Sequence, residues 1–416
     1  MPTRFGKGMA LAGLALGLAA TPAIAADTIK IAFIDPLSGM MAPIGEQGLA
    51  DYRYMAERIN AAGGVAGKKL EIVPMDNKLS PQESVVQAQK AIDQGIRIIT
   101  QGNSSGIAAG LIDFVNKNNE RNPGKELLYI NYAAVDPPLT NEKCSYWHFR
   151  WDANTDIKLQ ALTSYMKTNK DIKKVYLINQ DYSFGQGVRK VATEMIKAKR
   201  PDIQIVGDEL HPVAKITDFS PYIAKIKASG ADSVVTGNWG SDISLLLKAA
   251  GDAGLQANFY TFYAGGAGGP TAIKQAGLNG KVFAIIEGLA NAGGGDAQAF
   301  EAAFRKSHDG LGWTYPRVRN AMDMVAEAIN KAKSDDPLKL APILAGMKHK
   351  TMYGGESYMR ETDHQFFQDM YIANLIPVGG DVKFDEEKTG WGWHVAAKVP
   401  ASATVVPTTC KMQKPS

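Results

Sequence analysis

The sequence predicts an α/β protein of two doubly wound lobes, each a parallel sheet with helices on both faces. Short apolar runs that suit strands alternate with helical patterns from residue 29 onward, and this alternation is typical of parallel sheets covered by helices. The alternation restarts after residue 150. The chain has 416 residues, which is too long for one ordinary core and fits two domains of about 150–200 residues.

The first lobe is expected to contain four strands and three helices. The clearest helix start is at Ser80, a suitable N-cap that is followed by Pro81 and by Glu83 as the partner of a capping box. Gly95 ends this helix. The expected strands are Ile29–Ile34, Leu70–Pro74, Ile96–Thr100 and Leu127–Tyr132, and the expected helices are Gln47–Ala61, Ser80–Gln94 and Ile107–Asn118.

The second lobe shows the same kind of alternation, although it does not repeat the first lobe in sequence. Its expected strands are Lys174–Asn179, Ile203–Val206, Ser233–Gly237 and Asn258–Phe262, and its expected helices are Ile157–Thr168, Gly187–Ala198, Ser220–Ala228 and Ile243–Ala253. Two such sheets without a long linker suggest a ligand cleft between the lobes. Because ligands of these sheets bind beyond the carboxyl ends of the strands, the candidate loops are Asp35–Gly45, Gln101–Gly106, Ala133–Thr140, Gln180–Gly187, Asn238–Asp242 and Tyr263–Pro270.

The first 25 residues have the features of a secretory signal peptide. Arg4 and Lys7 form a basic start, an unbroken apolar and glycine run covers Met9–Ala20, and small residues precede the expected cleavage site after Ala25. The apolar run is too short to span a membrane, so a retained membrane anchor is the less favoured alternative. We therefore expect a periplasmic protein whose signal peptide is removed.

Composition argues against nucleic acid as a partner. The chain has 46 basic and 42 acidic side chains, and removing Arg4 and Lys7 lowers the basic total to 44. So small an excess does not provide the clustered positive charge that nucleic-acid binding needs. The sequence also has no His or Cys pair at the spacing of metal ligands, and we expect neither a metal nor a cofactor.

The chain contains only two cysteines, Cys144 and Cys410. In an oxidising compartment, a single pair far apart in sequence suggests one disulfide. That bond would attach the C-terminal tail to the end of the first lobe. Two unrelated buried thiols are the alternative.

The segment Gly102-Asn103-Ser104-Ser105-Gly106 is the most distinctive local pattern, because it follows an expected strand and opens an expected helix. It matches G-x-S-x-G, the nucleophile elbow of α/β-hydrolases. In that interpretation Ser104 is the nucleophile of a secreted serine hydrolase. The triad base would be one of the downstream histidines, which are His211, His308, His364 and His394. No HGGG-like segment for an oxyanion hole precedes it.

The same segment also suits anion binding, which we favour over catalysis. The first turn of a helix carries unpaired N–H groups and a partial positive charge, and hydroxyls of Ser104 and Ser105 could add donors for a carboxylate. Simple N-capping by one of these serines is the third interpretation.

Aromatic residues follow several of the expected strands in the second lobe. Trp239 lies just beyond a strand and has no obvious core partner, so we expect an exposed ring that stacks on a ligand or packs on the next helix. Phe184 and Tyr263 are further candidates. The segment Gly265–Pro270 lacks the residues of a phosphate-binding loop and is interpreted as a turn.

With these residues in view, the chain resembles the periplasmic substrate-binding proteins of branched-chain-amino-acid-type ABC importers, the Leu/Ile/Val-binding family of type I periplasmic binding proteins. The resemblance covers nearly all of the mature chain, and its motifs are individually weak but specific as an ordered set. They are Pro36–Gly39, Asn60–Gly67, Asp76-Asn77, Ala133–Thr140, Asp181–Gly187 and Asp218–Ser220.

The resemblance implies two flavodoxin-like lobes joined by a three-strand hinge. The crossings would lie near residues 148–154, 287–293 and 361–367. Lobe 1 would comprise residues 27–148 plus 290–362, lobe 2 residues 149–289 plus 363–400, and a C-terminal tail residues 401–416. Closure about the hinge would shield the ligand from water.

The resemblance also implies where the ligand is held. The family's carboxylate-binding groups match Ser104 and Ser105, with Asn103 beside them, and its backbone contact matches Ala133. Other family positions are changed here. A threonine corresponds to Val135, a tyrosine to Phe184, an aromatic residue to Ile44, and the acidic partner of the α-ammonium falls near Tyr263 or Ala264, neither of which is charged.

These changes lead to an expected function. A buried α-ammonium without an acidic partner is costly, so a carboxylate that lacks the amine, such as an aromatic or aliphatic acid, fits better than a branched-chain amino acid. Trp239, Phe184 and Tyr263 would supply apolar walls of the binding site. We expect a monomeric solute-binding protein, not an enzyme, which delivers its ligand to the membrane permease of an ABC importer.

Overall fold

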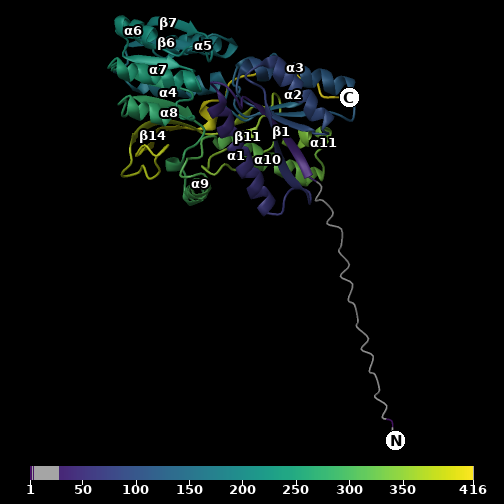
Figure 1. Cartoon of the computed structure of the whole chain (residues 1–416). Helices are drawn as coiled ribbons and strands as arrows, with labels where there is room; N and C mark the ends of the chain where they lie inside the picture. Colours follow the sequence, from purple (N-terminus) through teal and green to yellow (C-terminus); the bar gives the residue numbers. More distant parts are fainter. Residues whose placement is uncertain (2, 4–27, 416) are drawn as a thin grey trace.

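The computed structural model describes residues 1, 3 and 28–415. The expected signal peptide therefore lies outside the described residues, apart from its first and third positions. Two large sheets dominate the described part of the chain, one of five strands and one of seven. They form two lobes that lie side by side (Figure 1), as the sequence predicts.

The five-stranded sheet has the order β2-β1-β3-β4-β5 and is parallel throughout. All strands predicted for the first lobe are present, with ends that differ by one or two residues. The strands are β1 Thr28–Asp35, β2 Lys69–Asp76, β3 Ile98–Gln101, β4 Leu128–Asn131 and β5 His148–Arg150. The helices of this lobe are α1 Ala42–Ala61, α2 Pro81–Asp93, α3 Ser105–Arg121, α9 Gly295–Ser307, α10 Pro316–Ala332 and α11 Pro337–Leu344.

Local signals explain where these elements begin. The Oγ atom of Ser80 accepts a hydrogen bond from the backbone N–H of Glu83 at 3.2 Å, which confirms the predicted N-cap. Every residue of β3 and β4 is buried, because helices cover both faces of the sheet.

The seven-stranded sheet has the order β14-β13-β10-β9-β8-β6-β7. The five strands from β6 to β10 are parallel, whereas β13 and β14 add an antiparallel edge. The sequence predicts no strand at this edge. The strands are β6 Lys174–Gln180, β7 Gln204–His211, β8 Ser233–Thr236, β9 Asn258–Thr261, β10 Val282–Ile286, β13 Met370–Pro377 and β14 Trp391–Val399.

Four helices of the second lobe occur where the sequence predicts them, with differences at their ends. They are α4 Thr155–Thr168, α5 Ser183–Lys199, α6 Ser220–Ser229 and α7 Ser241–Asp252. The helix α8 Gly269–Gln275, by contrast, was not predicted and begins within the segment Gly265–Pro270 that was interpreted as a turn. A short antiparallel pair, β11 Tyr358–Met359 and β12 Phe366–Phe367, precedes β13. No described helix is both long and apolar enough to cross a membrane.

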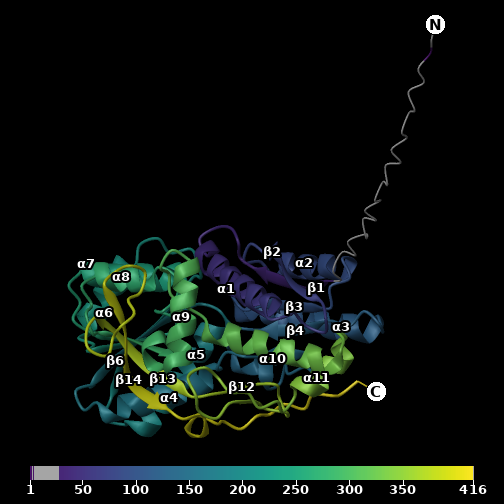
Figure 2. The same cartoon turned by 90° about the horizontal axis from the view of Figure 1, so that it is seen from below.

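The cores show how the chain passes between the lobes. One core takes its side chains from residues 29–151 and 300–366. Two further core clusters take their side chains from residues 153–289 and 367–393. Met41 and Val135 are the exceptions, because they precede these ranges but pack in one of the two clusters. Figure 2 accordingly shows α10 near α1, with α11 following at the end of α10, although α1 and α10 are far apart in sequence. The numerical lobe boundaries given above stay a prediction.

The C-terminal tail returns to the first lobe. Cys410 forms a disulfide with Cys144, with an S–S distance of 2.05 Å, which confirms the predicted pairing. The Oγ1 atom of Thr408 also donates to the backbone oxygen of Thr140 at 3.1 Å. In both views the C-terminus lies on the side of α11, away from β14 (Figures 1 and 2).

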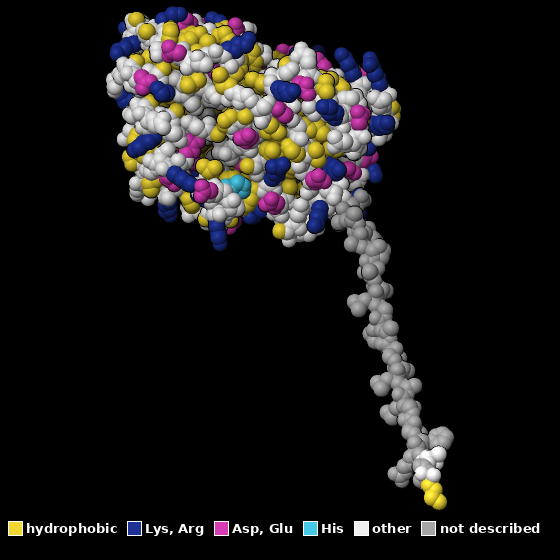
Figure 3. Space-filling view, viewed as in Figure 1, with side chains coloured by type: hydrophobic (Ala, Val, Ile, Leu, Met, Phe, Trp, Pro, Cys, Tyr) yellow, Lys and Arg dark blue, Asp and Glu magenta, His cyan; other side chains and the backbone are white. Residues whose placement is uncertain are grey.

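Basic and acidic side chains are interspersed over the face shown in Figure 3. This mixture agrees with the small excess of basic residues in the sequence.

Candidate ligand-binding cleft

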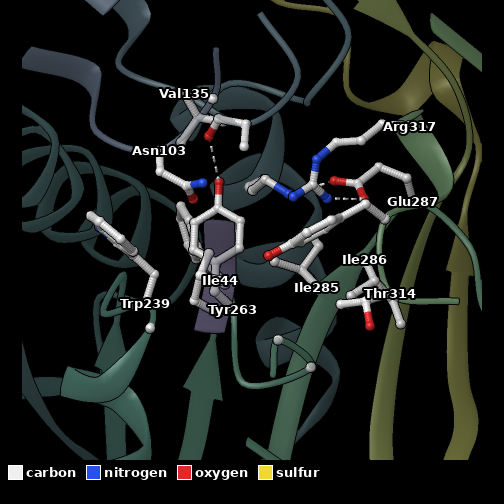
Figure 4. A pocket seen from close by; sticks show the side chains of 18 of the residues that line it. Ile44, Asn103, Val135, Trp239, Tyr263, Ile285, Ile286, Glu287, Thr314 and Arg317 are labelled. Carbon is white, nitrogen blue, oxygen red and sulfur yellow. Dashed lines mark hydrogen bonds and ion pairs between the residues drawn. The ribbon is translucent and has the colours of Figure 1, made fainter. Parts of the chain in front are cut away.

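A cavity lies between the carboxyl ends of the two sheets. The space between its lining atoms is about 920 Å³, a volume that includes open solvent. All six loops selected from the sequence contribute to its lining. All nine candidate residues line it, namely Ile44, Asn103, Ser104, Ser105, Ala133, Val135, Phe184, Trp239 and Tyr263 (Figure 4 labels several of them).

One side of the cavity, which we call the serine wall, consists of Asn103, Ser104, Ser105 and Ala133. Ser105 is the first residue of α3, and Ser104 precedes it with a φ of 84°, a backbone conformation that is strained for a residue with a side chain. The Ser104 hydroxyl does not cap α3, so the capping interpretation is wrong for this residue. The Oγ atom of Ser105 accepts from the backbone N–H of Asp136 at 3.2 Å.

Asp35, at the end of β1, holds the loop that leads into the serine wall. Its carboxylate accepts hydrogen bonds from the backbone N–H groups of Gly102 at 3.2 Å and Asn103 at 2.9 Å. The Tyr132 hydroxyl donates to it at 2.6 Å. Burial raises the pKa of Asp35 to about 7. Only glycine fits at position 102, because a Cβ atom there would lie 2.8 Å from the Cβ atom of Ala133.

The second lobe supplies an aromatic wall, formed by Tyr182, Phe184, Trp239 and Tyr263. The indole N–H of Trp239 donates to the Tyr182 hydroxyl at 2.9 Å, and the ring is only 6% exposed. This hydrogen bond and core packing hold the ring in place, which fits the packing alternative given above, and stacking on a ligand stays a prediction because Trp239 also lines the cavity. Phe184 lies with its ring centre 5.8 Å from that of Tyr182.

A third group of residues, which we call the charged wall, was not predicted. It comprises Lys158, Glu287 and Arg317, which line the cavity, and Asp152, which pairs with Lys158 and Arg317 but is not itself among the lining residues. The Nζ atom of Lys158 lies 2.7 Å from Glu287 Oε1 and 2.9 Å from Asp152 Oδ1. Arg317 contacts Glu287 Oε2 at 2.9 Å and Asp152 Oδ2 at 3.4 Å. Figure 4 shows Arg317 and Glu287 side by side at the cavity.

The charged wall is almost fully buried, with side chains between 0% and 4% exposed. Burial outweighs the neighbouring cations and raises the pKa of Asp152 to about 7. Lys158 and Arg317 hold the pKa of Glu287 below its usual range despite its burial. Asp152 and Glu287 raise the pKa of Arg317 above its already high value.

Tyr263 connects the serine wall with the charged wall. Its hydroxyl lies 3.0 Å from Asp152 Oδ2, to which it donates, and 3.4 Å from the backbone oxygen of Ala133. The sequence indicated that no acidic group lies at position 263 or 264. The structure adds that an acidic residue, Glu287, reaches the cavity from the end of β10, although it is already paired with two cations.

The two lobes touch across the mouth of the cavity. The Oγ atom of Ser241, at the start of α7, donates to the backbone oxygen of Met40 at 2.7 Å. At Gly240, an added Cβ atom would lie 2.4 Å from Met41 Sδ. The lobes are therefore close together in this structure.

The histidines required by the hydrolase interpretation lie elsewhere. No histidine occurs among the described residues that line the cavity. His211 interacts with the side chain of Asn238 at 2.8 Å, and His364 stacks on Phe149 with ring centres 3.9 Å apart.

Comparison with known proteins places these features in one class. The family model described as periplasmic binding protein matches residues 28–380. Leu/Ile/Val-binding protein homolog 4 of Brucella abortus is 33% identical over 414 residues, which covers 96% of each chain.

Solved structures agree. The closed leucine-, isoleucine-, valine-, threonine- and alanine-binding protein from Brucella ovis has 31% identity and a TM-score of 0.81, and the match covers 94% of this chain and 100% of that one. A solute-binding protein of an ABC transporter from Rhodopseudomonas palustris BisB5, in complex with 3,4-dihydroxybenzoic acid, shares the fold at 20% identity with a TM-score of 0.74, covering 90% of this chain and 98% of that one.

The fold, the interlobe cavity and these relatives define a solute-binding protein rather than an enzyme. The chain belongs to the periplasmic binding protein family, among the branched-chain-amino-acid-type proteins of ABC transporters. The family resemblance found in the sequence is thereby confirmed. The hydrolase interpretation of Ser104 finds no support.

Proposed function

We propose that this chain captures a small carboxylate-bearing molecule, an amino acid or an aromatic or aliphatic acid, by lobe closure in the periplasm and delivers it to the permease of an ABC importer. In this proposal the signal peptide is cleaved after Ala25 and the mature protein is a monomer. Two of the relatives named above are amino-acid-binding proteins by name, and the third is in complex with 3,4-dihydroxybenzoic acid; both kinds of ligand carry a carboxylate.

The observation that carries the proposal is the serine wall at the start of α3. The first turn of a helix has N–H groups without partners inside the helix and a partial positive charge. Ser104 adds a hydroxyl with no capping bond. Each hydrogen bond to a charged oxygen contributes about 1.5–3 kcal/mol when water is excluded.

The aromatic wall supplies the other half of the site. Phe184, Trp239 and Tyr263 come from three segments of the second lobe, which follow β6, β8 and β9, whereas the serine wall belongs to the first lobe. A ligand held by both walls makes its full set of contacts only when the lobes are together. Because a ligand shifts a conformational equilibrium through such differential contacts, capture and closure are coupled.

Isothermal titration calorimetry of the mature chain tests the proposal. The probes are leucine, 4-methylpentanoate and benzoate, each compared with its neutral amide. We expect at least one acid to bind with one-to-one stoichiometry and its amide to bind at least tenfold more weakly. Equal binding of acid and amide would contradict carboxylate recognition.

A further inference from the structure

We propose that Arg317, supported by the charge of Lys158, donates hydrogen bonds to a second oxygen of the ligand beside its carboxylate. The cleft then favours a 2-oxo acid over the matching α-amino acid. This inference rests on the proposed function, because it assumes that the serine wall holds a carboxylate.

The acceptors of the charged wall are already engaged. Glu287 contacts Lys158 through Oε1 and Arg317 through Oε2. Asp152 contacts Lys158 through Oδ1, and its Oδ2 accepts from Tyr263 and faces Arg317. Each of the four carboxylate oxygens therefore lies within ion-pair distance of a cation, although Asp152 Oδ1 has no hydrogen-bond partner among the described residues. Asp152 does not line the cavity, so a ligand ammonium would meet Glu287 and would have to compete with the two cations that already pair with it.

The donors, by contrast, are not all used. A guanidinium group has five N–H donors. Within the described part of the chain, Nε of Arg317 donates to the backbone oxygen of Tyr132 and Nη1 donates to Glu287, whereas Nη2 has no hydrogen-bond partner. Nη2 is not one of the fully buried polar atoms without a partner, so part of its surface is accessible. Because Arg317 lines the cavity, this accessible surface is available to a ligand there. An oxygen in the cavity can therefore accept from Nη2.

The position of Arg317 indicates which ligand oxygen it meets. Nε of Arg317 is bonded to Tyr132, the residue before Ala133 of the serine wall. The guanidinium carbon also lies 4.7 Å above the ring centre of Tyr315, which restricts its movement. The free donor therefore adjoins the place where the carboxylate is held, and an oxygen on the neighbouring carbon suits it.

The same arrangement disfavours an α-ammonium. Such a group would replace the acceptor oxygen with a cation beside Lys158 and Arg317. Like charges in a water-poor site repel strongly, and both acidic partners are already paired. The unfavourable electrostatic energy therefore concerns the amino group of the ligand, and the contacts of its carboxylate stay unchanged.

Three probes with one carbon skeleton test this inference by calorimetry. They are 4-methyl-2-oxopentanoate, leucine and 4-methylpentanoate, which carry an oxygen, an ammonium and only hydrogens at the second carbon. We expect the 2-oxo acid to bind about tenfold more tightly than 4-methylpentanoate, and leucine to bind more weakly than either.

The variant Arg317→Lys keeps the charge but removes the free planar donor. We expect it to abolish the tenfold advantage of the 2-oxo acid while changing the affinity for 4-methylpentanoate much less. Arg319→Lys is the matched control in the same helix, because Arg319 pairs with Asp323 and is not among the cavity residues. If Arg317→Lys fails to fold, as judged by circular dichroism, the charge-balanced variant Arg317→Gln with Glu287→Gln replaces it.

The outcomes separate this inference from the proposed function. If 4-methylpentanoate binds but the 2-oxygen gives no advantage, or if leucine binds more tightly than the 2-oxo acid, the inference is overturned and carboxylate capture stands. An advantage that survives in the Arg317 variants overturns the role of Arg317. If none of the three acids binds, both the inference and carboxylate capture by short aliphatic acids fail.

Discussion

The serine wall and the charged wall face one cavity but differ in construction. The serine wall comes from two neighbouring loops of the five-stranded sheet, and its donors are backbone groups and hydroxyls. The charged wall combines residues from α4, α10, the end of β10 and the segment after β5, so that both lobes contribute. One wall therefore belongs to a single lobe, whereas the other joins the two.

This difference has an energetic consequence. Neutral donors at a helix start can stay solvated until a ligand arrives. Buried ion pairs must compensate for the water they lose, and removing one partner leaves an uncompensated charge. We therefore expect changes in the serine wall to affect mainly ligand affinity, and changes in the charged wall to affect stability as well.

The largest expected effect is on folding, for Arg317→Met. This change leaves two buried carboxylates with one cation, and we expect it to lower the free energy of unfolding by about 3–5 kcal/mol. The double variant Arg317→Met with Glu287→Met keeps the charge balance and should lose roughly 1–2 kcal/mol. Urea unfolding followed by tryptophan fluorescence measures both.

The control for this comparison is Arg319→Met. Arg319 forms a partly exposed ion pair in the same helix, with its side chain 22% exposed, and its loss should cost about 1 kcal/mol or less. If Arg317→Met lowers the free energy of unfolding by no more than Arg319→Met does, the charged wall contributes no more to stability than a partly exposed ion pair.

The next effect concerns affinity, for Ser104→Ala combined with Ser105→Ala. Loss of the hydroxyl contacts should weaken binding of 4-methylpentanoate by roughly 10–100-fold. Loss of the hydrogen bond from the Asp136 N–H to Ser105 Oγ should lower the free energy of unfolding by about 1 kcal/mol. Calorimetry measures the affinity, and Ser220→Ala, at the exposed start of α6, is the control. An unchanged affinity would mean that the carboxylate is held elsewhere.

A smaller effect is expected for Gly240→Ala, which tests whether both walls must meet. The new methyl group would lie 2.4 Å from Sδ of Met41, a side chain that is only 1% exposed, so closure would be hindered. We expect about tenfold weaker binding. Gly254→Ala is the matched control, because both glycines have a φ of 61° but nothing lies within 4 Å of Gly254. Equal losses in the two variants would point to backbone strain alone.

The smallest effect is a pH dependence of affinity. Asp152, whose pKa is raised to about 7, faces Tyr263 and the other members of the charged wall. Below that pH Asp152 is protonated and neutral, so the positive charges of Lys158 and Arg317 outweigh the charge of Glu287 and attract an anionic ligand. Affinity for the anion should therefore be higher at pH 6 and fall roughly threefold by pH 8. The variant Asp152→Asn should abolish the share of the pH dependence that is due to Asp152. Any pH response that remains is attributed to Asp35, whose pKa is also about 7. An unchanged pH profile in the variant would exclude Asp152.

The same contrast explains what the sequence could predict. The strand–helix alternation and the loops after the strands depend on local patterns, and therefore the lobes and all nine candidate lining residues could be located. The serine wall belongs to this group, because a single five-residue segment carries most of it. The roles of these residues in binding stay a prediction.

Features that depend on tertiary contacts could not be predicted. The members of the charged wall lie far apart in the chain, and each alone looks like an ordinary surface residue. The hydrogen bond that holds Trp239 could not be predicted either, because its partner Tyr182 lies in a different loop. The antiparallel edge of β13 and β14 likewise depends on pairing with β10, and the local pattern gave no indication of it.

The disulfide has a mechanical consequence for the hinge. The chain leaves the seven-stranded sheet at Val399, and Cys410 is bonded to Cys144, between β4 and β5 of the other sheet. The segment from residue 400 to residue 409 is thus a covalent strap between the two sheets, in addition to the main-chain crossings. The halves can swing apart only as far as this strap can stretch. Reduction would release the strap and widen the swing without breaking a single peptide bond.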